Sequence, residues 1–183
     1  MEKKGISSEV KDETGAALIN EVYAPEYVTY NAKKHVSQLD KSGKAVSNDV
    51  KVEVDGAVMK YATFKCKFKN NKLVAADASK RPFFTLSFKA NKSATKEQKN
   101  YIKLLNKELK NKRAYFDIRK ADLSQATNVV AKMDKKRTKI SALTVTIGSD
   151  TMKLSKKDFT YTAKDGGFEV TGIGNCTGTL FIP

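Results

Sequence analysis

The sequence predicts a mostly β protein with two tandem β-sandwich domains, the first of which contains an inserted amphipathic helix. Short runs in which apolar and polar residues alternate recur along the chain and are typical of half-buried strands. Two of these runs, in different halves of the chain, also resemble each other, which indicates a repeated unit. Between them, one stretch places its apolar residues at helical spacing instead.

The composition allows a buried core and favours anionic partners. The chain has 183 residues, of which 40% are hydrophobic, and this argues against wholesale disorder. Its 35 basic residues outnumber 20 acidic ones, for a formal net charge of +15. Such a charge attracts polyanions without selecting one, so nucleic acid, cell-wall polymers and anionic glycans are candidate partners. The alternative is an ordinary lysine-rich surface.

Residues 1–19 are polar and predict a lead-in segment, and the first sandwich domain is expected over residues 20–120. Its strands are predicted where apolar residues stand at alternate positions. These positions are Val50, Val52 and Val54; Phe64, Cys66 and Phe68; Phe84, Leu86 and Phe88; and Ala114, Phe116 and Ile118.

The second domain is expected over residues 121–183, where the same alternation returns. Its apolar positions are Leu143, Val145 and Ile147; Phe159, Tyr161 and Ala163; Phe168 and Val170; and Leu180 and Ile182. The stretch 49–60 can be aligned with 142–153, which pairs Met59 and Lys60 with Met152 and Lys153. This alignment predicts a β-hairpin in each copy.

The helix is predicted near residues 95–112. Thr95, with Gln98 three residues later, has the spacing of a capping box. On a helical wheel one face collects apolar side chains and the other collects lysines. The predicted apolar face contains Tyr101, Ile102, Leu104, Leu105 and Leu109. The predicted basic face contains Lys96, Lys99, Lys103, Lys107 and Lys110.

Three motifs carry a family resemblance. They are Asp158-Phe159-Thr160, the glycine-rich run Gly172-Ile173-Gly174-Asn175-Cys176-Thr177-Gly178-Thr179, and Phe116 to Ser124. The chain resembles the immunoglobulin-like repeats found in tandem on secreted and surface proteins of Firmicutes. The resemblance is good over 140–180, fair over 48–72 and 114–124, and poor over 73–113. It implies two immunoglobulin-like sandwiches and a structural or adhesive role.

The resemblance also bears on location. No run approaches the roughly 20 apolar residues of a membrane helix, so no membrane insertion is expected. Residues 1–11 contain no apolar segment of a signal peptide, which leaves a cytoplasmic protein or one whose signal has been removed. The repeats favour the second alternative, so we expect a cell-surface or secreted protein.

No group of residues has the spacing of a catalytic, cofactor or metal site. His35 is the only histidine, Cys66 and Cys176 stand far apart, and neither residue type forms a ligand pair. Glycines 172, 174 and 178 have the spacing of a phosphate loop, but no helical pattern follows them, which favours a structural turn. We therefore expect no enzymatic activity and no cofactor.

The sequence leaves two hypotheses for function. The first is a monomeric, non-enzymatic structural or adhesive module whose partner is a protein, a cell-wall polymer or a glycan. The second is a polyanion-binding protein that uses Lys96, Lys99, Lys103, Lys107 and Lys110, although a solvated helix face explains these lysines as well. A further basic cluster, outside the helix, contains Lys132, Lys135, Lys136, Arg137 and Lys139.

Overall fold

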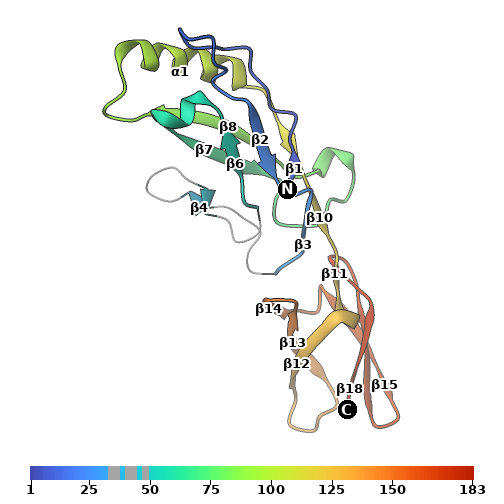
Figure 1. Ribbon diagram of the computed structural model, residues 1–183. Helices are drawn as coiled ribbons and strands as arrows, with labels where there is room; N and C mark the ends of the chain where they lie inside the picture. The colour runs from blue at the N-terminus through green and yellow to red at the C-terminus, as the bar shows by residue number, and fades with distance from the viewer. Residues whose placement is uncertain (33–37, 40–44, 47–49) are drawn as a thin grey trace. The chain divides into compact units, whose positions relative to one another are not determined.

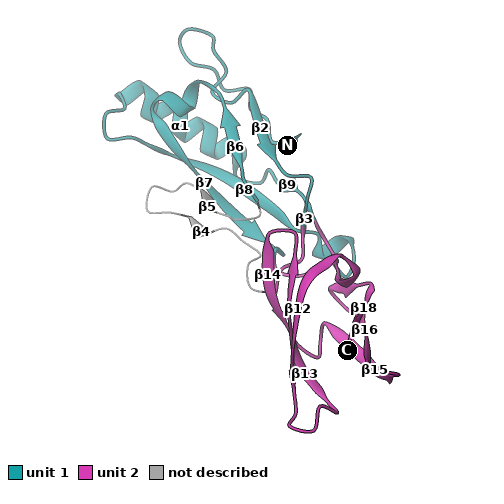
Figure 2. Cartoon of the chain, turned by 60° about the horizontal axis from the view of Figure 1, so that its bottom comes forward, with its two compact units in different colours: residues 1–28, 36–71, 75–117 teal, residues 29–35, 72–74, 118–183 magenta. Residues whose placement is uncertain are grey.

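The computed structural model describes residues 1–32, 38–39, 45–46 and 50–183, and His35 lies outside these ranges. The described chain is mostly β, with 46% of residues in strands and one α-helix (Figure 1). It divides into two compact units (Figure 2). Unit 1 comprises residues 1–28, 36–71 and 75–117, and unit 2 comprises 29–35, 72–74 and 118–183.

The first sheet of unit 1 has three antiparallel strands in the order β1-β2-β6, which are Glu2–Lys3, Glu21–Ala24 and Glu53–Asp55. Residues 1–19 are part of this unit and more than a lead-in to it. Ile6, Leu18 and Ile19 are all buried in its core. Polar residues separate these apolar residues at irregular spacing, so neither a strand nor a helix periodicity identifies them in the sequence.

The second sheet of unit 1 has the order β7-β8-β9, with strands Ala62–Lys69, Phe83–Ala90 and Ala114–Tyr115. The predicted alternation in its two long strands is confirmed, since Phe64, Cys66, Phe84, Leu86 and Phe88 are buried. Phe68 is half-buried and packs its ring 5.4 Å from that of Phe84. The alternate positions of β7 and β8 therefore form one apolar face of the sheet.

Helix α1 (Lys96–Leu109) lies beside β8 (Figure 1). The capping box is confirmed, because Thr95 Oγ1 accepts from Gln98 N and Gln98 Oε1 accepts from Thr95 N. Ile102, Leu105 and Leu109 are buried as predicted. The prediction for Leu104 is wrong, since 56% of this residue is exposed. At about 100° per residue it falls outside the arc shared by the three buried residues.

The predicted hairpin at residues 49–60 is wrong, and this stretch differs from its aligned partner. β6 is followed by the 3-10 helix η1 (Ala57–Lys60), so Met59 and Lys60 are helical while Met152 and Lys153 lie in a strand. A Cβ at Gly56 would lie 2.2 Å from the carbonyl oxygen of Leu18. This close backbone contact turns the chain away from the course of a second strand.

Unit 2 contains two three-stranded antiparallel sheets. The first has the order β12-β13-β14, with strands Ala126–Met133, Ile140–Ile147 and Asp150–Leu154. The second has the order β15-β16-β18, with strands Phe159–Lys164, Gly167–Gly172 and Thr179–Ile182. Their buried side chains include Ile140, Leu143, Val145, Met152, Leu154, Phe159 and Val170.

The remaining elements are short. In unit 2, β11 (Ala121–Asp122) pairs in parallel with β17 (Cys176–Thr177), next to the 3-10 helix η3 (Leu123–Gln125). Two of the boundaries between the units fall within β3 and β10, and two more fall at residues 71–72 and 74–75. The other short elements are β3 (Tyr27–Thr29), β4 (Gln38–Leu39), β5 (Ala45–Val46), η2 (Ala78–Lys80) and β10 (Asp117–Arg119).

Candidate functional site

The predicted basic face of α1 exists as an exposed surface, which we call the lysine stripe. It consists of Lys96, Lys99, Lys103, Lys107 and Lys110, and all five are exposed. Within the described ranges, no carboxylate lies within 4.0 Å of any of their ammonium groups. Like charges at i and i+4 on a helix repel each other, so the stripe is a mildly unfavourable arrangement that a bound polyanion would relieve.

The second basic cluster lies at the turn between β12 and β13 in unit 2, and its members are also exposed. Asp134 shapes this turn by accepting hydrogen bonds from Thr138 N at 2.6 Å and Lys139 N at 2.9 Å. The bond from the Lys139 amide is the main reason that the pKa of Asp134 is lowered. The cluster thus lies around a β-turn, whereas the lysines of the stripe lie in a row along one face of α1.

The glycine-rich motif closes unit 2 on itself. Gly172 N donates to Gly178 O at 2.8 Å, and Ala121 N donates to Asn175 O at 3.0 Å. A Cβ at Gly178 would lie 2.1 Å from Oδ1 of Asp122. From Gly178 the chain continues into strand β18. The glycines thus allow the backbone to approach itself closely, as a structural turn requires.

The two cysteines are free and buried, one in each unit. Cys176 stands where the resembling repeats have an aromatic residue, and only 1% of it is exposed. Burial raises the pKa of each thiol to about 12, so both are neutral at physiological pH.

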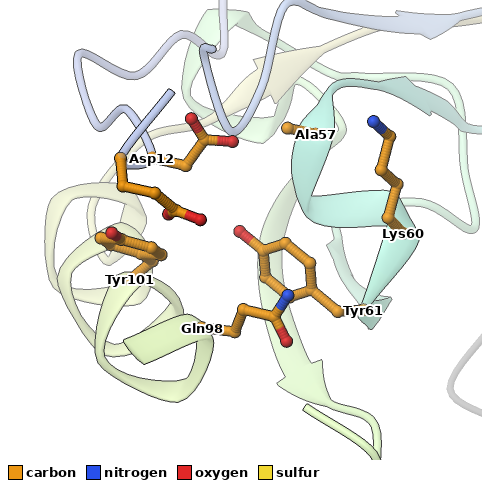
Figure 3. A pocket seen from close by; sticks show the side chains of 7 residues that line it. Asp12, Ala57, Lys60, Tyr61, Gln98 and Tyr101 are labelled. Carbon is orange, nitrogen blue, oxygen red and sulfur yellow. The ribbon is translucent and has the colours of Figure 1, made fainter. Parts of the chain in front are cut away.

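Unit 1 contains a pocket that the sequence did not predict (Figure 3). Its volume is about 160 Å³. Three segments that are distant in sequence form it: the loop after Lys11, helix η1 with the residue that follows it, and the first half of α1. The lining residues are Asp12, Glu13, Ala57, Lys60, Tyr61, Gln98 and Tyr101.

Tyr61 is the most unusual member of the pocket. Its side chain points into the cavity (Figure 3), although only 9% of the residue is exposed. Its hydroxyl has no hydrogen-bond partner among the described residues. A buried hydroxyl in this state costs about 1–3 kcal/mol. Burial, and then the charges of Asp12 and Glu13, raise the pKa of Tyr61, so the hydroxyl is a neutral donor.

The acidic side of the pocket is held in place by local hydrogen bonds. Asp12 Oδ1 accepts from Thr14 Oγ1 at 2.6 Å, from Thr14 N at 2.9 Å and from Ala16 N at 3.0 Å. The first of these bonds is the main reason that the pKa of Asp12 is lowered, so the carboxylate is charged. A hydrogen bond to Glu13 is the main reason that the pKa of Tyr101 is raised.

Gln98 completes the pocket from the helix. Its Oε1 accepts the capping-box hydrogen bond from Thr95 N at 2.8 Å. Its amide nitrogen lies on the side of Tyr61 (Figure 3). The pocket thus combines carboxylate acceptors with amide and phenol donors, and the ammonium of Lys60 borders it.

A second pocket in unit 1, of about 260 Å³, is also lined by charged residues, and four of them form two ion pairs, Lys4 with Glu2 and Arg81 with Asp117. Lys4 Nζ donates to Glu2 at 3.2 Å and to Tyr115 O at 3.1 Å. Arg81 donates to Asp117 at 3.1 Å. These two pairs account for four of the charged groups without a ligand, in contrast to the Tyr61 hydroxyl, which has no partner among the described residues.

Within the described part of the chain, no three His, Cys, Asp or Glu side chains gather as a metal ion would require. Nor do the described residues include a helix with the length and apolar character to cross a bilayer.

The chain matches no protein-family model, no curated protein and no solved structure at a significant level. Its similarity to the immunoglobulin-like repeats therefore rests on the three sequence motifs alone.

Proposed function

We propose that this chain is a non-enzymatic structural or adhesive module of a bacterial cell-surface or secreted protein, with immunoglobulin-like β units. The observation that carries the proposal is how the glycine-rich motif is used. In unit 2 it joins β17 to β11 and places Gly178 directly against the carboxylate of Asp122. The motif therefore stabilises the fold of unit 2. A structural use of this kind, in a chain with two compact β-rich units, supports a repeated structural module of a longer protein.

The test is the location of the protein. Intact cells of the bacterium that encodes it would be treated briefly with protease, and the released peptides would be identified by mass spectrometry. We expect peptides of this chain in the released fraction or in the growth medium, without peptides of cytoplasmic enzymes. Recovery of the chain only after cell lysis would contradict a surface or secreted role.

A second candidate function is polyanion binding, which the lysine stripe favours. Its five exposed ammonium groups lie on one helix face, and within the described residues none is neutralised by a carboxylate at close range. Lys96 and Lys110 are about 20 Å apart along the helix at its usual rise. A linear anionic polymer could therefore contact several of these lysines at once and release its counterions.

Binding to duplex DNA and to purified Gram-positive cell wall would be measured at low and moderate salt. The test variant changes all five stripe lysines to glutamate, and circular dichroism checks that it remains folded. The matched control changes the five basic residues of the β12–β13 cluster to glutamate, which alters the net charge equally. If the stripe is the site, only the first variant stops binding.

For DNA, each single lysine removed should then make the slope of log affinity against log salt shallower by about one. Equal weakening in both five-residue variants would point to net charge alone.

A further inference from the structure

We propose that the pocket of unit 1 binds one neutral sugar ring of a glycan, through adjacent hydroxyl groups that contact Asp12, Tyr61 and Gln98. This inference rests on the proposed adhesive function, for which it names a contact site and a ligand class. It does not involve the lysine stripe, whose exposed ammonium groups suit anionic polymers.

The first argument for a bound ligand is the buried hydroxyl of Tyr61. The residue is nine-tenths buried, and its hydroxyl points into the cavity without a partner among the described residues (Figure 3). A polar group in this position binds solvent or a ligand. The hydroxyl oxygen is itself buried, so a ligand group reaches it once the side chains at the pocket mouth move aside. A sugar hydroxyl both donates and accepts, so it can then pair with Tyr61 and leave no group unpaired.

The mixture of charges selects a neutral ligand. The carboxylates of Asp12 and Glu13 oppose an anion, and the ammonium of Lys60 at the border offsets part of their attraction for a cation. A hydroxyl group avoids both penalties. One hydroxyl can donate to the carboxylate of Asp12 while it accepts from Tyr61. A neighbouring hydroxyl on the same ring can accept from the amide of Gln98.

The size of the pocket sets the extent of the ligand. A volume of about 160 Å³ is close to the roughly 150 Å³ cavity that holds benzene in another protein. A sugar ring with its hydroxyl groups is larger than benzene, so only the edge that bears the adjacent hydroxyls would enter the pocket. Two tyrosine side chains, Tyr61 and Tyr101, line it and provide apolar surface beside their hydroxyls. Glu13 and Lys60 are exposed at its border, so the ring could belong to a longer chain that continues into solvent.

The carboxylate and the amide are held in place before a ligand arrives. Three hydrogen bonds from residues 14 and 16 hold one oxygen of Asp12. The capping box fixes Gln98 at the start of α1. Because these groups need not be ordered on binding, even a small ligand could bind measurably. For a single ring we expect a dissociation constant on the order of 1 mM.

The experiment uses the full chain on an array of neutral oligosaccharides, followed by calorimetric titration of any that bind. One arm presents bacterial cell-wall glycan fragments, and another presents neutral plant and animal oligosaccharides, so the source of the sugar is distinguished. A third arm presents sialylated and sulfated counterparts, which we expect to bind this pocket more weakly. Several ligands on one surface raise the apparent affinity enough for detection.

The test variant is Tyr61→Phe, which removes only the unpartnered hydroxyl and keeps the ring. We expect it to lose about tenfold in affinity for the sugar while it melts at an unchanged or higher temperature. Asp12→Asn, which keeps an oxygen for the local turn but turns the other acceptor into a donor, is expected to lose binding as well. The matched control is Tyr115→Phe, the same substitution in the same unit but outside this pocket, and it should bind normally.

The proposal is overturned if no neutral oligosaccharide binds the unaltered chain at millimolar concentration, or if Tyr61→Phe and Tyr115→Phe bind equally well. That result would leave the surface module untouched, because its test is the location of the protein on intact cells. Conversely, a protein found only inside cells would end the adhesive proposal even if a free sugar binds.

Discussion

Asn106 of helix α1 forms two hydrogen bonds with the backbone of Phe88 in strand β8. Its Oδ1 accepts from Phe88 N at 2.8 Å, and its Nδ2 donates to Phe88 O at 2.8 Å. Strand β9 pairs only with Phe83 and Phe84, so it does not reach this part of β8. The Asn106 side chain therefore takes the place of a neighbouring strand at the open edge of the sheet.

This relationship predicts that Asn106→Ala lowers the free energy of unfolding by about 2–3 kcal/mol, because two partly buried backbone groups lose their partners. Urea denaturation followed by circular dichroism would measure it. Asn100→Ala on the exposed side of the same helix is the control and should change stability little. A similar small effect at both positions would mean that solvent replaces Asn106 at no cost.

The glycine-rich motif gives a second prediction. Gly178→Ala should destabilise the protein by about 3 kcal/mol, because its φ of +78° is unfavourable for alanine and the new Cβ would meet Asp122. Gly148→Ala is the matched control, since its φ is +60° but nothing lies within 4 Å of the new Cβ. It should cost only about 1 kcal/mol. Equal destabilisation by both substitutions would show that the contact with Asp122 is easily relieved.

Two tyrosines predict opposite effects of the same substitution. Tyr61→Phe removes a hydroxyl that has no partner among the described residues, so thermal stability should stay the same or rise. Tyr30→Phe removes a buried hydroxyl that donates to Asp158 at 3.2 Å. We expect it to lower stability by about 1–2 kcal/mol. Thermal unfolding of both variants would check the contrast, and a marked drop in the melting temperature of Tyr61→Phe would contradict it.

Glu108 predicts part of the pH dependence of stability. Hydrogen bonds from Glu9 N at 3.0 Å and Ser8 Oγ at 2.8 Å lower its pKa from the usual 4.5 in the folded protein. The stabilisation is therefore complete above about pH 4.5 and is lost as the pH falls through the folded-state pKa.

Glu108→Gln should flatten the decrease in melting temperature between roughly pH 5 and pH 3, because glutamine has no proton to gain. Glu97→Gln, an exposed acid on the same helix, serves as the control. Since Glu108 is partly exposed, the effect should be modest and should shrink in high salt. Parallel pH profiles for the unaltered protein and Glu108→Gln would contradict the assignment.

Local patterns in the sequence identified several elements correctly. The alternation in β7, β8 and β13 is strong because each strand has one buried face, and period two then appears directly in the residue types. The capping box at Thr95 and Gln98 is equally local, since both partners lie within one helical turn. The exposed lysine stripe follows from the same helical periodicity.

The errors arose where a distant contact decides local structure. The stretch 49–60 resembles 142–153 in sequence, yet the backbone contact of Gly56 with Leu18 ends the strand and begins η1. Leu104 is a different kind of error, because the helical spacing alone places it outside the arc of Ile102, Leu105 and Leu109, and its apolar type led to the wrong assignment. Residues 1–19 supply core side chains whose partners come from later parts of unit 1.

By itself, the sequence determined the β-rich class, the capped helix with its basic face, and the glycine-spaced turn, because each depends on residues close together in the chain. Only the tertiary structure decided where the pocket lies. Asp12, Tyr61 and Gln98 have no common motif and meet because separate segments pack together in unit 1. That packing buries the hydroxyl of Tyr61 without giving it a partner among the described residues, a property that no sequence pattern records.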